Sequence, residues 1–175
     1  GRKINDVLDL GCGDGRSVDI FRRADPDIKW IGLDIEGSPE VQARKRSDAT
    51  FVSYDGITFP FEENAFDLVY SHQVFEHVRY PEAVLRETFR TLRPGGMFIG
   101  STSQLEPYHS YSFWNYTVYG FARLLEESGF VLREIRPGID GPTLIERSRS
   151  ADRSAYAKFF AEESPLNKEI AESAA

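Results

Sequence analysis

Apolar runs of strand length recur along the chain, and helical patterns separate most of them. The predicted strands cover residues 7–10, 30–34, 50–53, 66–71, 97–100, 130–135 and 143–145. Buried strands that alternate with crossover helices are typical of a parallel sheet with helices on both faces. The pattern therefore predicts an α/β fold of the doubly wound, Rossmann-like class.

Capping residues and helix breakers mark the predicted helices. One helix follows the glycine-rich loop and ends near Arg23, and a short one follows Ser38, an N-cap residue next to a proline. Apolar residues at helical spacing predict a helix over residues 81–92, ended by the breakers at 94–96. A further helix is predicted over residues 117–128, where Thr117 would be the cap.

The chain is predicted to form one domain, because it has no internal repeat and no linker. With 175 residues, 41% of them hydrophobic and 28% charged, it has an ordinary globular composition. We place the domain at residues 1–149 and expect residues 150–175 to form a C-terminal tail, helical or partly disordered. A ligand of such a domain should bind beyond the carboxyl ends of the central strands.

Charge and cysteine content limit the partners and the compartment. The net charge of −7 argues against nucleic acid, and the basic run at residues 44–46 is interpreted as a solvated helix end. Cys12 is the sole cysteine, which rules out an intrachain disulfide and a cysteine cluster for zinc. No apolar stretch reaches the roughly 18 residues of a membrane span. A cytoplasmic location is therefore expected, with no membrane span.

The loop DLGCGDGRS, which begins at Asp9, holds Gly11, Gly13 and Gly15 directly after the first strand. A dinucleotide fingerprint would have the spacing G-x-G-x-x-G and would place phosphate on the helix N-terminus. The spacing here is G-x-G-x-G, and the Asp9 carboxylate would repel phosphate oxygens. The loop therefore favours a ligand with a cationic head, and a nicotinamide oxidoreductase is disfavoured.

Carboxylates also end the next two predicted strands. Asp34 can accept hydrogen bonds from both hydroxyls of a ribose, and Asp55 can accept one from the exocyclic amine of adenine, with the Gly56 amide as donor to a ring nitrogen. Each carboxylate alone could be a solvated loop residue. Ribose, adenine and a cationic head without phosphate together describe S-adenosyl-L-methionine, which is the predicted cofactor.

Several motifs in order resemble the class I S-adenosylmethionine-dependent methyltransferases, in particular the small-molecule group with D-A-x-x-L-P-F and R-x-L-(K/R)-P-G-G motifs. They are VLDLGCGDG, GLDI, DGITFPFEENAFDLVYS, VFEHV and LRETFRTLRPGGMFIGS. The resemblance covers residues 7–101 and is only architectural beyond them. It implies a seven-stranded sheet in the order 3-2-1-4-5-7-6, with the last strand antiparallel.

The same resemblance implies the cofactor contacts residue by residue. Asp9 and the loop Gly11, Cys12 and Gly13 would face the methionine part, and Asp34 would hold the ribose. Ile35 would pack on adenine, and Asp55 with Gly56 would bind its edge. Ser71 and His72 would line the sulfonium end. The helix that precedes the first strand in many relatives is missing here, which puts enclosure of the substrate in doubt.

Methyl transfer requires in-line positioning, and it requires a general base only when the acceptor keeps its proton at neutral pH. Four residues near the expected site could act as this base: His72, Glu76, His77 and His109. We take His109 as the first choice for a catalytic base, followed by His72. Some relatives hold a metal ion with a Glu-x-x-Glu-His motif, but Gln73 replaces the first Glu here, and a neutral amide is a weaker ligand. No metal is predicted.

An aromatic segment after the fifth strand is the predicted acceptor site. Its contacts would come from Tyr108, Tyr111, Trp114 and Tyr116, although any one of these could instead pack its own loop. Rings with polar tips suit a sugar-like or ring-bearing small molecule. We therefore expect methylation of a small molecule, on oxygen rather than nitrogen or carbon. The alternative is a cofactor-binding module without catalysis, either a pseudo-enzyme or a partner subunit.

Overall fold

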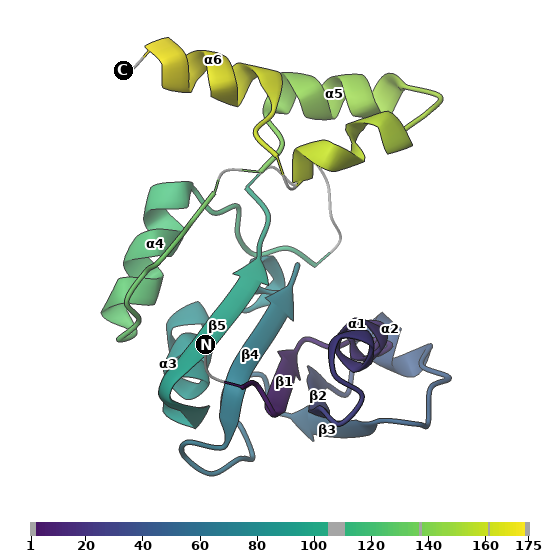
Figure 1. The fold of residues 1–175 in the computed structure, drawn as a ribbon, viewed down its shortest axis with the longest axis vertical. Coiled ribbons are helices and arrows are strands. Elements are labelled where there is room, and N and C mark those ends of the chain that lie inside the picture. The colour runs from purple at the N-terminus through teal and green to yellow at the C-terminus, as the bar shows by residue number, and fades with distance from the viewer. Residues whose placement is uncertain (1–2, 105–110, 137, 161, 174–175) are drawn as a thin grey trace.

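The strands form one parallel sheet in the order β3-β2-β1-β4-β5, shown in Figure 1. The computed structural model describes residues 3–104, 111–136, 138–160 and 162–173. Its strands are β1 (Asp6–Leu10), β2 (Lys29–Ile35), β3 (Thr50–Tyr54), β4 (Phe66–His72) and β5 (Leu92–Ser101). All neighbouring pairs are parallel. The first five predicted strands and the Rossmann-like α/β class are confirmed.

Two helices begin directly after the capping residues predicted from the sequence, Ser38 and Thr117. The helical segments of the sheet region are α1 (Ser17–Ala24), α2 (Pro39–Gln42), the 3-10 turn η1 (Phe75–His77), α3 (Pro81–Thr91) and α4 (Val118–Glu127). The Ser38 hydroxyl accepts a hydrogen bond from the Val41 amide at 3.2 Å, and the Thr117 hydroxyl accepts one from the Gly120 amide at 3.0 Å. Each side chain thus satisfies an amide that the first turn leaves unpaired.

The sixth and seventh predicted strands are wrong, and so is the seven-stranded order with an antiparallel last strand, for the part of the chain that the structure describes. Residues 130–135 form no strand or helix, and Phe130 and Leu132 pack against the core. Residues 143–145 belong to the helix α5 (Gly141–Arg149). Asp140 caps this helix through the Thr143 amide, and a proline occupies its first turn. These start signals outweigh the short apolar run.

The predicted breakers at residues 94–96 lie inside β5 rather than between two elements. Phe66 pairs with Leu92, but Leu68 pairs with Met97, so the strand carries an irregularity opposite Asp67. Extra residues in one strand of a pair form a bulge. Glycine and proline are tolerated at such a point, although they would weaken a regular strand.

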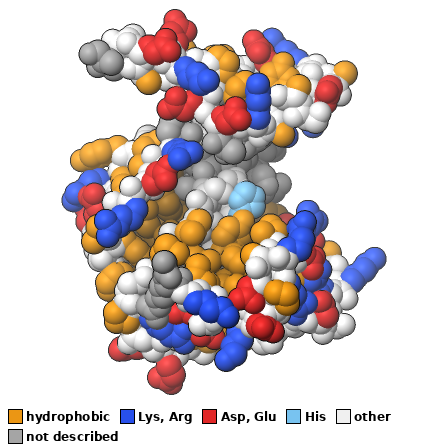
Figure 2. Space-filling model, viewed as in Figure 1, with side chains coloured by type: hydrophobic (Ala, Val, Ile, Leu, Met, Phe, Trp, Pro, Cys, Tyr) orange, Lys and Arg blue, Asp and Glu red, His pale blue; other side chains and the backbone are white. Residues whose placement is uncertain are grey.

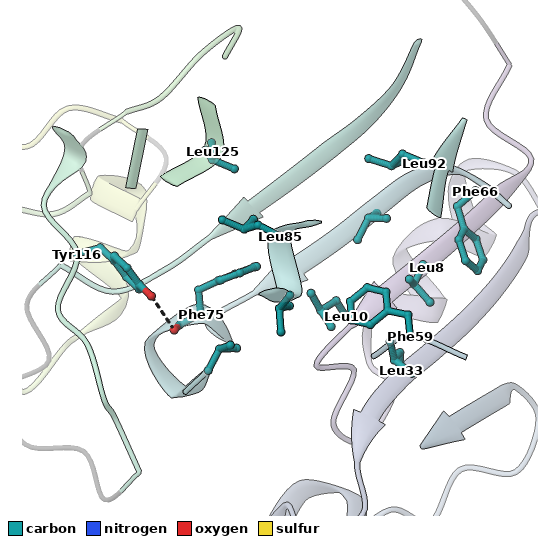
Figure 3. Close-up of a cluster of buried hydrophobic side chains, with 13 residues drawn as sticks. Leu8, Leu10, Leu33, Phe59, Phe66, Phe75, Leu85, Leu92, Tyr116 and Leu125 are labelled. Carbon is teal, nitrogen blue, oxygen red and sulfur yellow. Dashed lines mark hydrogen bonds between the residues drawn. The ribbon is translucent and has the colours of Figure 1, made fainter. Parts of the chain in front are cut away.

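The core lies on both faces of the sheet because successive side chains of a strand point to opposite faces. On one face, Leu8 and Leu10 pack with residues of α3 and α4 in the cluster that Figure 3 shows. On the other face, Val7 packs with Val18 of α1 and with Trp30. Asp9 shares this second face with Val7, so its carboxylate points toward α1.

Three helical segments follow the sheet region: α5, the 3-10 helix η2 (Ser154–Phe160) and α6 (Pro165–Ser173). Figure 1 shows them beyond the carboxyl ends of β4 and β5. The helical form of the predicted tail is therefore present in η2 and α6, whereas the domain boundary at residue 149 stays a prediction. None of the helices in the described ranges combines the length and apolar composition that a membrane crossing needs.

Candidate functional site

Three carboxylates lie at one edge of the sheet, because β1, β2 and β3 are parallel neighbours. Asp9 is one residue before the end of β1, Asp34 is one residue before the end of β2, and Asp55 directly follows β3. The register pairs Leu10 of β1 with Ser71 of β4, which brings the carboxyl end of β4 to the same edge. The structure thus brings together the candidate residues that the sequence places far apart.

The glycine loop turns sharply between β1 and α1. Gly11, Gly13 and Gly15 have φ values of +70°, +50° and +83°, a region that side chains with a Cβ rarely adopt. The Gly11 amide donates to the Leu33 carbonyl at 2.7 Å, which fastens the loop to β2. A Cβ on Gly11 would lie 2.3 Å from Val74 Cγ2. Glycine is therefore required by both conformation and space.

Asp9 is the most buried of the three carboxylates. Its Oδ2 accepts a hydrogen bond from the Ser17 hydroxyl at 2.5 Å, and the Ser17 oxygen accepts one from Trp30 Nε1 at 2.9 Å. Burial raises the pKa of Asp9 to about 7, the hydrogen bond from Ser17 opposes the rise, and the charge of Asp34 adds to it. Neither Ser17 nor Trp30 was predicted from the sequence, although Ser17 belongs to the quoted loop.

Asp34 links the glycine loop to the end of β2. Its Oδ2 accepts from the Gly13 amide at 2.7 Å, and its Oδ1 accepts from the Ile35 amide at 2.8 Å. Burial raises the pKa of Asp34, while these two hydrogen bonds oppose the rise. A carboxylate offers about four lone pairs, so each oxygen can accept one further hydrogen bond. That capacity matches two neighbouring hydroxyls of a ribose.

Arg44 corrects the interpretation of residues 44–46 as a solvated helix end. Its Nε donates to the Gly13 carbonyl at 2.8 Å, and its guanidinium carbon lies 3.8 Å from the centre of the Phe51 ring. Arg46 is also engaged and forms an ion pair with Asp19. A run of basic residues gives no sign of such long-range partners, so sequence patterns could not have found this contact.

The predicted adenine contacts form a small apolar surface around one turn. Asp55 Oδ1 accepts from the amides of Ile57 and Thr58 at 2.8 and 2.7 Å, and these hydrogen bonds lower the pKa of Asp55. Gly56 has a φ of +85°, and a Cβ there would lie 3.8 Å from the Ile35 side chain. Ile35 and Ile57 are 42% and 40% exposed, so a flat apolar ring could pack on them.

The carboxyl end of β4 carries Ser71 and His72. Ser71 is fully buried, and its hydroxyl has no hydrogen-bond partner within the described residues. A buried polar atom without a partner is uncommon and is consistent with a ligand contact. His72 is exposed, and its Nδ1 lies 2.7 Å from the Ser101 hydroxyl. Cys12, in contrast, is buried, and its thiol is held protonated because burial and the nearby carboxylates raise its pKa to about 12.

The residues weighed for a metal site have other partners. Glu76 is buried and accepts a hydrogen bond from the Thr102 hydroxyl at 2.9 Å. The Gln73 amide oxygen accepts from the Ser103 hydroxyl at 3.2 Å. Among the residues that the structure describes, no group of three or more His, Cys, Asp or Glu side chains could hold a metal ion.

The aromatic segment docks on the turn after β4. The Phe113 amide donates to the Glu76 carbonyl at 2.7 Å, and Trp114 Nε1 donates to the Val78 carbonyl at 2.8 Å. Tyr116 is buried in the core, and its hydroxyl donates to the Phe75 carbonyl at 3.3 Å, as drawn in Figure 3. Tyr111 is 67% exposed. Tyr108 and His109 lie outside the described residues.

A groove of about 2840 Å³ runs along β5 to His72, Gln73 and residues 101–104. Its lining also includes Leu144 of α5 and Lys168 of α6, and Figure 2 shows a hollow between these helices and the body of the molecule. Typical ligand pockets measure about 300 to 1,000 Å³, so the groove is too large to be one such pocket. Only its end at His72 lies close to the candidate cofactor residues, because Ser71 pairs with Leu10 beside the glycine loop.

A family model described as "Methyltransferase domain" matches residues 8–100, more than half of the chain. The chain belongs to this methyltransferase family. The matched segment contains Asp9, the glycine loop, Asp34, Asp55 and His72, so the candidate cofactor residues lie within it, whereas Ser101 and the aromatic segment follow it. The resemblance to class I S-adenosylmethionine-dependent methyltransferases is confirmed.

Relatives named for several different methyltransferase activities share this domain. A Mycolicibacterium smegmatis protein named as a probable S-adenosylmethionine-dependent methyltransferase is 29% identical over 81% of the chain and 58% of its own length. A demethylmenaquinone methyltransferase from Renibacterium salmoninarum is 33% identical over 53% of the chain and 39% of its own length. The chain therefore spans about half the length of the curated relatives that it matches.

Solved structures share the fold. A Haloferax volcanii methyltransferase in complex with the Trm112 methyltransferase activator has a TM-score of 0.66 at 24% identity, and the match covers 89% of this chain and 77% of that one. The Haemonchus contortus phosphoethanolamine N-methyltransferase 2 in complex with S-adenosyl-L-methionine has a TM-score of 0.64 at 20% identity. That match covers 99% of this chain and 44% of that one.

Proposed function

We propose that this protein binds S-adenosyl-L-methionine and transfers its methyl group to an oxygen of a small molecule. The observation that carries the proposal is the row of Asp9, Asp34 and Asp55 at the carboxyl edge of the sheet, beside a loop that only glycines can form. This arrangement suits a cationic ligand with a ribose and an adenine, and it lies inside the matched family segment.

The residues present fit that cofactor. Asp34 has acceptor capacity for two ribose hydroxyls, and Ile35 with Ile57 offers an apolar surface for the adenine ring. The buried Ser71 hydroxyl offers a hydrogen-bonding group at the end of β4. When bound, the cofactor supplies an electrophilic methyl group on a sulfonium. The protein would then orient the acceptor and exclude water.

The acceptor is proposed to bind at the end of the groove beside His72. Tyr111 and Trp114 are 67% and 43% exposed and can offer flat contact area, and the ring of the buried Tyr116 lies 6.4 Å from that of Trp114. A sugar-like or aromatic small molecule fits such a surface. His109 stays our proposed general base for an acceptor that keeps its proton, with His72 as the second candidate.

Calorimetry with S-adenosylhomocysteine and with NAD tests the cofactor. We expect binding of S-adenosylhomocysteine only, and Asp34→Ala should weaken it by about 1.5 to 3 kcal/mol, because charged hydrogen bonds to the ribose are lost. Asp14→Ala is the matched control, since Asp14 belongs to the same loop but pairs with the exposed Arg16. Binding of NAD alone, or equal affinity in the Asp34 variant, would overturn the assignment.

Incubation with labelled cofactor and a panel of sugars, phenols and quinones tests the chemistry. We expect label on an oxygen of at least one acceptor, and we expect His109→Ala to lower turnover without changing cofactor affinity. Cofactor binding without transfer to any acceptor would favour the module without catalysis. Full activity of the His109 variant would remove this residue from the mechanism.

A further inference from the structure

A chain of side-chain hydrogen bonds runs from the loop after β5 to His72. The Ser103 hydroxyl donates to Gln73 Oε1 at 3.2 Å, and Gln73 Nε2 donates to the Ser101 hydroxyl oxygen at 3.3 Å. Ser101 Oγ lies 2.7 Å from His72 Nδ1. Ser101 accepts from Gln73 through its oxygen and keeps its own proton, so its hydroxyl can donate to the histidine.

The backbone of Gln73 is held in an unusual conformation that supports this chain. Gln73 has a φ of +55°, which is uncommon for a residue with a side chain. Its amide donates to the Ser101 carbonyl at 2.9 Å, which fixes the turn next to β5. Strained residues of this kind persist where the surroundings determine them, and they cluster at functional sites. The conformation places the Gln73 side chain between Ser101 and Ser103.

We propose that Ser101 is a positioning residue that makes His72 a hydrogen-bond donor to the methyl acceptor. The Ser101 hydroxyl donates to Nδ1, so the proton of the neutral imidazole resides on Nε2. A protonated Nε2 has no lone pair for a further proton, so in this proposal His72 is a donor and no longer the second candidate base. It donates to an acceptor oxygen instead. The proposal rests on the proposed function and narrows its acceptor class.

The favoured acceptor is an oxygen that is already ionised near neutral pH, such as a carboxylate or an acidic phenolate. A lone pair of this oxygen forms the new O–CH₃ bond, while the electron pair of the broken S–CH₃ bond stays on sulfur. The negative charge of the acceptor and the positive charge of the sulfonium cancel. No proton has to be removed, which agrees with a donor at Nε2.

Nitrogen NMR of the histidine side chains tests the proton position without cofactor or acceptor. The chain has three histidines, and His72→Gln assigns the signals of His72. At a pH where the ring is neutral, we expect a protonated Nε2 and an unprotonated Nδ1 that accepts a hydrogen bond. Ser101→Ala should remove this bond and Ser101→Thr should keep it. A proton on Nδ1 would overturn the proposal, even if S-adenosylhomocysteine binds as expected.

Thr102→Ala is the matched control, because Thr102 is adjacent but bonds to Glu76. We expect it to leave the Nδ1 signal unchanged. In contrast, Ser103→Ala should weaken the hydrogen bond to Nδ1, because it removes the bond from Ser103 to Gln73.

Benzoate and benzyl alcohol serve as paired acceptor probes. We expect more methyl transfer to benzoate than to benzyl alcohol, and a transfer rate that does not rise with pH between about 5 and 8. We also expect His72→Gln to keep more activity than His72→Ala, because glutamine can still donate a hydrogen bond. Transfer to benzyl alcohol alone, lost equally in both variants, would indicate a base and overturn the donor role.

Discussion

At the residue scale, the site depends on a few positions where the chemistry of one side chain, or its absence, decides the geometry. Asp9 carries a carboxylate into the sheet face that otherwise packs Val7 and Trp30, and Ser17 is its hydrogen-bond donor. The Val74 side chain packs directly against Gly11, where the Cβ of any other residue would collide with it. Both effects are local, so each can be changed by a single substitution.

Asp9 makes the stability depend on pH in an unusual direction for a carboxyl group. In the unfolded chain its pKa is 3.8, whereas in the folded protein it is about 7. Between these values the folded state holds the proton more tightly, so the free energy of unfolding falls as the pH rises from about 4 to 7. The loss is at most about 1.4 kcal/mol per unit of pKa difference.

Urea unfolding of the wild type and of Asp9→Asn across this pH range measures the effect. We expect the stability of the variant relative to the wild type to increase with pH. A constant difference would show that Asp9 ionises at the same pH in both states.

Gly11→Ala should abolish cofactor binding or destabilise the protein. The new Cβ would meet Val74 Cγ2 at 2.3 Å and would force a φ of +70° on alanine. Gly37→Ala is the matched control, because a Cβ there has no neighbour within 4 Å. Thermal unfolding and calorimetry with S-adenosylhomocysteine check both variants. An intact Gly11 variant would mean that the turn between β4 and α3 can move away at little cost.

At the element scale, Asp140 joins two helices that are separate in sequence. Its Oδ1 accepts from the Thr143 amide in α5 at 2.7 Å, and its Oδ2 accepts from the Leu166 amide in α6 at 3.1 Å. The Asp140 amide also donates to the Ser164 hydroxyl at 2.9 Å. One carboxylate therefore serves the amino-terminal turns of both helices.

Asp140→Ala should cost about 1 to 3 kcal/mol of the stability of this helical part, since two caps are lost together. Thr117→Ala removes the single cap of α4 and is expected to cost about half as much. Although burial raises it, the pKa of Asp140 is lowered on balance by hydrogen bonds from Ser164, Thr143 and Leu166. Its contribution is therefore present above the unfolded pKa of 3.8 and is lost as the pH falls through the lower folded value.

Helix content by circular dichroism during urea unfolding compares the Asp140 and Thr117 variants. An equal loss of unfolding free energy in the two variants would argue against a double cap at Asp140.

At the scale of the whole molecule, the apolar core and the C-terminal helices are unequally connected. The two buried clusters draw their described members from residues 4–132, and none comes from α5, η2 or α6. In Figure 1 these helices lie away from the sheet. Segments with few buried apolar contacts open at low free energy.

Hydrogen exchange followed by mass spectrometry should show this difference. We expect peptides from β1 and β4 to exchange last, and those from α5 and α6 to exchange early, before global unfolding. Equal protection of α5 and β4 would contradict the expectation and would indicate one cooperative unit.

The sequence predicted much of the parallel sheet and part of the site. Apolar runs of strand length and glycine punctuation located β1 to β5, and Asp9, Asp34 and Asp55 followed from their places at strand ends. The predicted strand at residues 143–145 is wrong, because a capping aspartate and a proline there start a helix despite the short apolar run. The sequence pattern also assigned Arg44 to solvent, because nothing local indicates a bond to Gly13.

What the sequence determined by itself is the kind of fold and the cofactor chemistry, since both depend on local patterns: apolar runs of strand length, a glycine spacing and carboxylates at strand ends. Only the tertiary structure decided how many strands pair and which partners the side chains have. Ser17 with Asp9, Arg44 with Gly13, and Ser101 with His72 are contacts between separate segments. The register of β4 and β5 pairs His72 with Ser101, whereas the other two contacts depend on how α1 and the loops pack at the edge of the sheet. No local sequence pattern indicates such packing.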